Sequence, residues 1–313
     1  MNNAFFDTIF LKDDSILEKQ LEILKLGSQK SQEDIYMLEM GIKGEKQLEY
    51  HLKKANVGMY ALRDVNLQYN DMKAQIDFVV VTSHHCYFIE CKNYTADIIH
   101  VDENGNFSIS KKYGGKYVKK GINSPLSQAE DQLTIFKKIC LNNEKRVKEL
   151  LNGVRFNEYF RAITVFTNQD CFLNIKKAPS DMKYRILKVD NLIRQIEKDK
   201  LYYKSKNFSK EEMNKIANFI LENNVAVSLE EYREEKRMTE QRDYIIVHGK
   251  KMLLKDISNL SNKHNYHSNT VDDIKINSNF KRKQLIELIK KIGLIILLFL
   301  LSFIFYKIYF GAR

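Results

Sequence analysis

The chain has 313 residues and a formal net charge of +11, which favours an acidic partner such as nucleic acid or an anionic membrane surface. This length leaves room for a main domain and accessory segments, and 44% hydrophobic with 29% charged residues is typical of a globular protein. The four cysteines show no CxxC spacing, which argues against a zinc site, and the first residues lack the pattern of a signal peptide.

Residues 13–40 carry leucine and isoleucine at helical spacing, and we expect one or two helices there. A further helix is expected over residues 41–55. On its wheel Glu45 falls beside the apolar stripe of Leu48 and Leu52 rather than on the lysine-rich side. This position is unusual for a solvated glutamate, so Glu45 is a candidate site residue.

Residues 75–92, QIDFVVVTSHHCYFIECK, read as a buried β-hairpin. Side chains alternate between faces along a strand, so Glu90 and Lys92 point the same way, and Asp77 shares a face with two valines of its own strand. Charges are rarely placed on buried strands unless they are paired or bind a metal, so these three side chains indicate a site. The two histidines at residues 84–85 are expected to be exposed turn residues rather than ligands.

A small β-meander is expected over residues 98–118, and residues 111–120 are expected to form a loop. This stretch holds five lysines, two tyrosines and no acid, which suits sequence-independent contacts with phosphates. The alternative is an ordinary solvated loop. The candidate nucleic-acid residues are Lys111, Lys112, Lys116, Lys119 and Lys120.

A helix is expected from Ser124 to about Leu141, and further strands near residues 160–167 and 184–189. The expected organisation is an N-terminal helical segment (1–40), a main domain (41–200), a charged helical region (201–258), a polar linker (259–284) and a C-terminal helix (285–310).

Residues 292–310 carry a single charge, Lys307. As a helix they would span about 28 Å, close to the hydrocarbon thickness of a bilayer. Lysines and an arginine precede the segment, so the positive-inside rule places the large domain in the cytoplasm. We expect residues 285–310 to be the single transmembrane helix of a tail-anchored protein. The alternative is a buried core helix.

Asp77 and Glu90 on adjacent strands would offer carboxylate oxygens to a hard divalent ion, with the main-chain carbonyl of Cys91 as a third ligand. Mg²⁺ takes one or two carboxylates and keeps several waters, so this sparse set suits it, with Mn²⁺ as the alternative ion. Lys92 could orient or deprotonate the attacking water and offset phosphate charge, and Glu45 could add a ligand or hold a metal-bound water. The set predicts metal-assisted hydrolysis of a phosphodiester.

The pattern Asp77…Glu90-x-Lys92 resembles the PD-(D/E)xK nuclease motif, in which an acid lies one strand before an acid–x–lysine triplet. Over roughly residues 41–170 the chain is also similar to the nuclease-related domain (NERD) family. The segments that carry this resemblance, in order and spacing, are GIKGEKQLEYHL (41–52), QIDFVVV (75–81), FIECKNY (88–94) and NSPLSQ (123–128).

The resemblance implies nuclease activity and a restriction-endonuclease-like α/β core, with a central mixed sheet flanked by helices. The sequence departs from the family pattern at Ser124, where the family tends to have Asn, and at Cys91, where an apolar residue is usual. The site residues that it implies are Glu45, Asp77, Glu90, Lys92 and, on a site-facing helix, Gln128.

Our sequence-based hypothesis is a membrane-anchored nuclease that faces the cytoplasm and cleaves DNA with Mg²⁺. One alternative is a non-catalytic module that binds nucleic acid or another partner at the membrane. Another is a scaffold whose basic faces bind anionic lipid.

Overall fold

The fold is described from a computed structural model of the full chain. Contacts divide the chain into two units, Met1–Leu229 and Glu230–Arg313. The described residues are 7–26, 32–202, 207–227, 229–230, 244–247 and 250–253.

The second unit contains a short antiparallel hairpin of β11 (Tyr244–Val247) and β12 (Lys250–Leu253), in a region expected to be helical. The expected linker at 259–284 and the expected transmembrane helix at 285–310 lie outside the described residues. Among the helices of the described ranges, none combines the length and apolarity that crossing a membrane requires.

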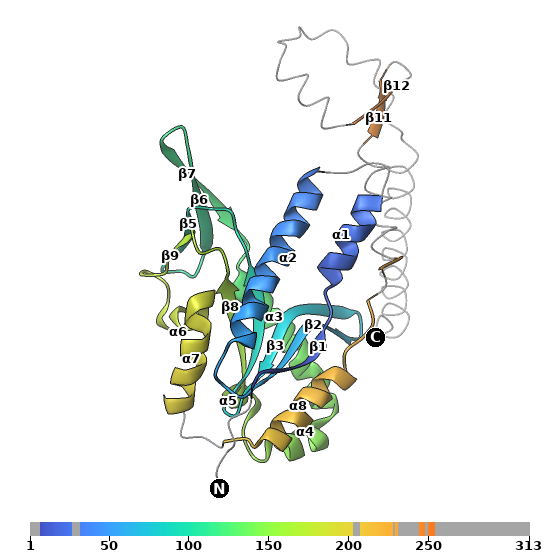
Figure 1. The fold of residues 1–313 in the computed structure, drawn as a ribbon, viewed down its shortest axis with the longest axis vertical. Coiled ribbons are helices and arrows are strands. Elements are labelled where there is room, and N and C mark those ends of the chain that lie inside the picture. Colours follow the sequence, from blue (N-terminus) through green and yellow to red (C-terminus); the bar gives the residue numbers. More distant parts are fainter. Residues whose placement is uncertain are drawn as a thin grey trace, which may run out of the picture. The chain divides into compact units, whose positions relative to one another are not determined.

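A six-stranded mixed sheet forms the centre of the first unit (Figure 1), in the order β1-β2-β3-β4-β8-β10. Strands β2, β3 and β4 pair antiparallel, whereas β1 joins β2, and β8 joins β4 and β10, in parallel. This confirms the expected mixed α/β sheet. The strands are β1 (Ile9–Asp13), β2 (Tyr60–Tyr69), β3 (Met72–Val81), β4 (Cys86–Lys92), β8 (Phe160–Phe166) and β10 (Ile186–Lys188).

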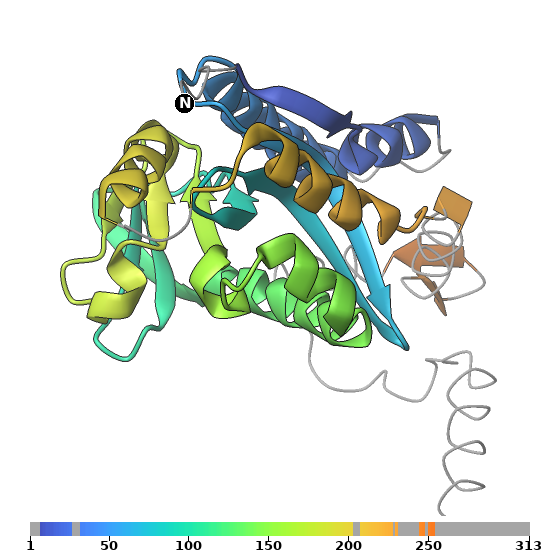
Figure 2. The same cartoon turned by 90° about the horizontal axis from the view of Figure 1, so that it is seen from below.

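Helices cover both faces of this sheet, because alternate strand residues are apolar on both sides (Figure 2). Helices α2 (Gln32–Lys53) and α7 (Val189–Tyr202) pack on one face. Helices α3 (Pro125–Asn142), α4 (Glu144–Leu151) and α8 (Lys210–Glu222) pack on the other. Further helices are α1 (Ile16–Leu26), which lies against α2, and the single turns α5 (Phe156–Tyr159) and α6 (Ser180–Lys183).

Helix α2 runs unbroken through the point where a separate helix was expected to begin. Both glycines of the G-x-x-G-E sequence, Gly41 and Gly44, lie inside it. A Cβ on Gly44 would lie 2.8 Å from Asn93 Cβ and 2.9 Å from Thr167 Oγ1. The glycine therefore lets α2 approach the ends of β4 and β8 closely, which places the next residue, Glu45, against the sheet.

A second sheet has the order β7-β6-β5-β9. The lysine-rich stretch expected as a loop is in fact a β-hairpin. Its turn is Gly114–Gly115, both with positive φ (54° and 84°), which suits a two-residue hairpin turn. Residues 111–121 of this hairpin are exposed on both faces. Neither face therefore shows the apolar alternation by which a sequence predicts strands. The strands are β5 (Ile98–Val101), β6 (Phe107–Tyr113), β7 (Lys116–Ile122) and β9 (Phe172–Asn174).

The turn between β3 and β4 is buried, which corrects the expectation that its histidines are exposed. His85 is fully buried and His84 nearly so. Thr82 Oγ1 accepts the backbone N–H of His85 at 3.0 Å, and Phe208 N donates to Ser83 O at 2.8 Å. The segment before α8 therefore covers this turn, a long-range contact that the local sequence does not encode.

Candidate active site

A cavity of about 380 Å³ collects residues from α2, β3, β4 and α3. It lies where the chain leaves β4 for the second sheet. Asn93 to Thr95, which follow β4, form part of its wall. Cys91 lines the same cavity, as do all five predicted catalytic residues, Glu45, Asp77, Glu90, Lys92 and Gln128.

Asp77 lies where the backbone ladder between β3 and β4 ends. The last ladder pair is Phe78 with Ile89, and beyond it Asp77 Oδ2 accepts the N–H of Cys91 at 2.7 Å. Burial, followed by the charges of Glu90 and Glu45, raises the pKa of Asp77 well above its usual range. The carboxyl is therefore held among other acids in a setting that disfavours its charge.

Glu90 is 2% exposed and has a partner for each carboxylate oxygen. Lys92 Nζ donates to Oε1 at 2.5 Å, and Gln132 Nε2 donates to Oε2 at 2.7 Å. The same Gln132 nitrogen donates to the carbonyl of Gln75 at 2.7 Å. Glu90 is thus fixed in orientation by one residue of its own strand and one residue of α3.

Gln132 was not among the predicted site residues. Gln128, which was, lines the cavity on its exposed side, whereas Gln132 lies one helical turn further along and is 5% exposed. The available signal was the four-residue spacing of the two glutamines, which places both on one side of a helix. Only the packing of α3 on β4 shows which of them reaches the acid.

Lys92 remains a cation in this site. Burial by itself would lower its pKa, but the charge and hydrogen bond of Glu90, with the charge of Asp77, outweigh burial and raise it. A protonated ammonium beside two acids can donate hydrogen bonds and offset negative charge. It cannot accept a proton until that balance changes.

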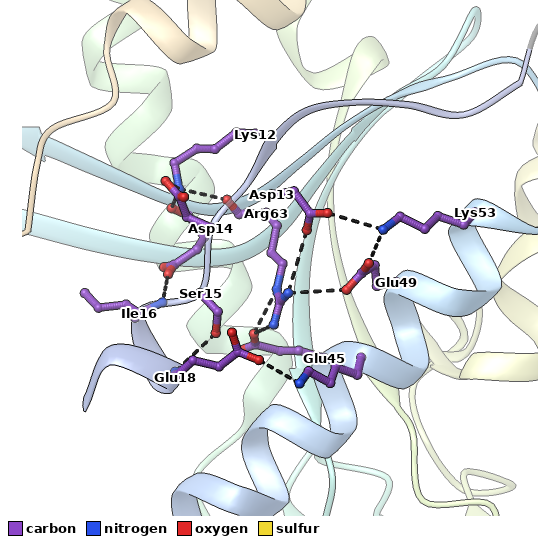
Figure 3. Close-up of polar contacts among 12 residues, drawn as sticks. Lys12, Asp13, Asp14, Ser15, Ile16, Glu18, Glu45, Glu49, Lys53 and Arg63 are labelled. Carbon is purple, nitrogen blue, oxygen red and sulfur yellow. Dashed lines mark hydrogen bonds and ion pairs between the residues drawn. The ribbon is translucent and has the colours of Figure 1, made fainter. Parts of the chain in front are cut away.

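Glu45 is 6% exposed and is paired with a buried arginine that the sequence did not single out (Figure 3). Arg63 of β2 donates from Nε at 3.1 Å and from Nη2 at 2.8 Å, and both bonds end on Glu45 Oε2. Burial raises the pKa of Glu45, and Arg63 offsets this only in part. Oε1 is therefore the oxygen that could serve the cavity.

Arg63 also joins Glu45 to a wider group of charges, drawn in Figure 3. Its Nη1 lies 3.3 Å from Glu49 Oε2 and 3.7 Å from Asp13 Oδ1. Lys53 Nζ lies 3.3 Å from Asp13 and also contacts Glu49. The network ties α2 to β1 and β2 beside the candidate site.

The donors in the cavity suit a hard divalent cation. Asp77 and Glu90 offer carboxylate oxygens. The pKa of Asp77 is raised first by burial and then by the charges of Glu90 and Glu45, and a bound cation would favour the charged carboxylate against both causes. Among the described residues, no group of three or more His, Cys, Asp or Glu side chains is arranged to hold a metal. An ion here would therefore rely on two carboxylates with main-chain and water oxygens, a set that Mg²⁺ accepts.

Residues 40–167 match the family model of the nuclease-related domain (NERD). The match runs from α2 to the end of β8 and includes all five predicted catalytic residues, and it confirms the resemblance predicted from the sequence motifs. No curated protein and no solved structure matches the chain.

Proposed function

Since residues 40–167 form a nuclease-related domain, we propose that this chain hydrolyses phosphodiester bonds in DNA with Mg²⁺ as its cofactor. The observation that carries the proposal is that Asp77, Glu90 and Lys92 line one cavity, with Lys92 Nζ 2.5 Å from Glu90 Oε1. In metal-assisted phosphodiester hydrolysis two acids can hold the ion, and a lysine beside them can offset the charge on the phosphate.

Asp77, Glu90 and the carbonyl of Cys91 would hold the ion. When bound, Mg²⁺ supplies Lewis-acid stabilisation of phosphate charge and lowers the pKa of water. The protein's own contribution is orientation. Gln132 fixes Glu90 Oε2, and the Cys91 N–H fixes Asp77 Oδ2, so neither carboxylate has to be ordered when substrate binds.

Lys92 would act as a hydrogen-bond donor that neutralises the charge developing on the phosphate. Its raised pKa supports this role over that of a general base. Glu45 would remain bound to Arg63 through Oε2 and present Oε1 to the cavity, where it could orient a water. These roles differ in pH dependence, because only a base must lose its proton before the reaction.

The test is a cleavage assay with the full chain, supercoiled DNA and Mg²⁺ or Mn²⁺, with chelator as the blank. Glu90→Gln and Lys92→Met should each reduce the cleavage rate by about 100-fold or more, because each removes a charge from the reacting centre. Glu103→Gln, in the exposed turn between β5 and β6, is the matched control and should cleave as the unmodified chain does.

Unchanged cleavage in both site variants would refute the assignment. Binding of DNA without any divalent-dependent cleavage would instead favour the second candidate, a non-catalytic nucleic-acid-binding module. One observation favours that candidate: Glu90 and Glu45 each form an ion pair with a cation of the chain itself, Lys92 and Arg63 respectively.

We also propose that residues 285–310 anchor the protein in a bilayer with the large domain in the cytoplasm. The support is the single charge in residues 292–310 and the basic residues that precede them. The protein should stay with the membrane fraction after alkaline carbonate extraction, and Lys281 should be accessible to protease from the cytoplasmic side. Release into the soluble fraction would refute the anchor.

A further inference from the structure

We infer that the β6–β7 hairpin is an arm that inserts into the major groove of double-stranded DNA. The choice of nucleic acid as the partner rests on the proposed nuclease function. The arm projects from the second sheet, away from the six-stranded sheet (Figure 1). Such an arm would select duplex over single-stranded DNA, a choice that the catalytic residues do not specify.

The base of the arm is fixed to the body of the domain. Phe107 is 3% exposed in an apolar cluster with Ile99, and Asp97 Oδ2 accepts the backbone N–H of Lys112 at 2.6 Å. The ladder continues without a break from Phe107 opposite Ile122 to Tyr113 opposite Lys116. Every residue from 111 to 121 is exposed, so the outer part of the arm is a two-stranded ribbon whose side chains are open to solvent.

The cations of the arm are distributed over both of its faces. Residues directly opposite each other in a ladder share a face, and successive pairs alternate between the faces. The pairs Lys111–Val118 and Tyr113–Lys116 therefore share one face, as does Lys120 opposite Ile109. The pairs Lys112–Tyr117 and Ser110–Lys119 lie on the other face. No acidic residue occurs from 110 to 122.

Lysines on both faces of the arm suit binding within a DNA groove better than binding to a flat membrane surface. In a groove the ribbon lies between two phosphate backbones, so lysines on both faces find anions. Against a flat anionic bilayer only one face would be used. The major groove of B-form DNA, about 12 Å wide, admits a two-stranded β-ribbon. The major groove of duplex RNA is too narrow and deep for side chains to read.

The aromatic residues at the tip support contact with more than phosphate. Tyr113 is 60% exposed and Tyr117 is 57% exposed, on opposite faces beside the Gly114–Gly115 turn. Exposed tyrosines at the end of a basic ribbon would pack on sugars and base edges within the groove. The lysines would determine the affinity for DNA, and the tyrosines would determine how deeply the arm enters the groove.

The test measures binding of the full chain to a short fluorescent DNA duplex by anisotropy, without divalent ions so that no cleavage occurs. Lys111→Ala with Lys116→Ala removes two charges from one face, and Lys112→Ala with Lys119→Ala removes two from the other. Each pair should weaken duplex binding about tenfold and reduce the slope of log affinity against log salt by about two. Arginine at the same positions should restore binding.

The matched control is Lys145→Ala with Lys148→Ala on α4, at the opposite end of the first unit in Figure 1, which removes the same charge and should bind as the unmodified chain does. Unchanged binding in both hairpin variants would overturn the proposal. An equal loss of affinity for single-stranded DNA or duplex RNA would refute insertion into the major groove of DNA. A loss confined to one face and repeated on phosphatidylserine vesicles would assign the arm to membrane instead.

These results are independent of those for catalysis. Duplex binding through both faces without Mg²⁺-dependent cleavage would support the role of the arm and refute the proposed nuclease activity. Cleavage that is unaffected by both hairpin variants, with unchanged binding, would retain the nuclease and reject the arm.

Discussion

Arg63 donates two hydrogen bonds to a single oxygen of Glu45, from Nε at 3.1 Å and from Nη2 at 2.8 Å. The arginine side chain is 5% exposed and the glutamate side chain 8%. A buried ion pair contributes little compared with a well-packed apolar pair, but loss of one partner leaves an uncompensated charge. The glutamate of the G-x-x-G-E sequence is therefore held in place by a cation from β2.

Arg63→Met should lower the free energy of unfolding by about 3–5 kcal/mol, because Glu45 would remain buried without its partner. Urea denaturation at pH 7 measures this change. Adding Glu45→Gln should recover part of the loss, since it removes the unpaired charge, and the four chains form a double-mutant cycle. A loss in the double variant equal to the sum of the two single losses would show that the two residues are not coupled.

Gln132→Met should weaken Mg²⁺ binding by about 10–100-fold, because Glu90 Oε2 would lose the donor that orients it. Isothermal titration with Mg²⁺, and with Mn²⁺ as a second probe, measures the affinity separately from cleavage. Gln128→Met on the same helix is the matched control, since Gln128 is exposed at the cavity rim, and it should have the smaller effect. A larger effect at Gln128 would favour the residue that the sequence motif selected.

The contrast between these two glutamines shows how far the sequence could lead. Asp77, Glu90 and Lys92 were predictable because period-two alternation and a hairpin are local, and the structure brings them into one cavity. Gln132 reaches Glu90 across 42 residues and Arg63 reaches Glu45 across 18, through the packing of helices on the sheet. Neither contact follows from a local pattern.

The same limit explains what was predicted of the fold. The strand β3 was predictable because its apolar residues alternate between faces, but β1 lies in a segment that was expected to be helical, and the outer parts of β6 and β7 have no apolar face and read as a loop. The parallel pairing of β4 with β8 joins segments about 70 residues apart, which a single sequence does not specify.

Gly44→Ala should lower the free energy of unfolding by about 1–3 kcal/mol, although alanine is the better helix former. Its Cβ would lie 2.8 Å from Asn93 Cβ and 2.9 Å from Thr167 Oγ1, so α2 would have to move away from β4 and carry Glu45 with it. Gly41→Ala is the control. Its Cβ would meet only the terminal Cδ1 of Leu17, which can rotate away, so stability should be unchanged or slightly higher. Equal costs at the two glycines would refute the close approach at Gly44.

Because of His85, the free energy of unfolding should decrease in mild acid. Burial, with the nearby charges of Arg161 and His84, lowers the pKa of His85 from 6.5 to about 3. The folded state therefore keeps the ring neutral, while the unfolded chain takes up a proton near pH 6.5. Stability that is fully present above pH 6.5 is lost as the pH falls toward 3, by about 1.4 kcal/mol per pH unit for this one proton.

The measurement is the free energy of unfolding at several pH values between 7 and 4, for the unmodified chain and for His85→Phe, which keeps an aromatic ring 5.8 Å from that of Tyr87 but cannot titrate. The comparison uses the slope rather than the absolute stability, because other titrating groups contribute equally to both chains. The variant should lose less stability per pH unit below 6.5, by about one proton's worth. Parallel curves would mean that His85 is protonated in the folded protein, and that the covered turn between β3 and β4 admits a charge.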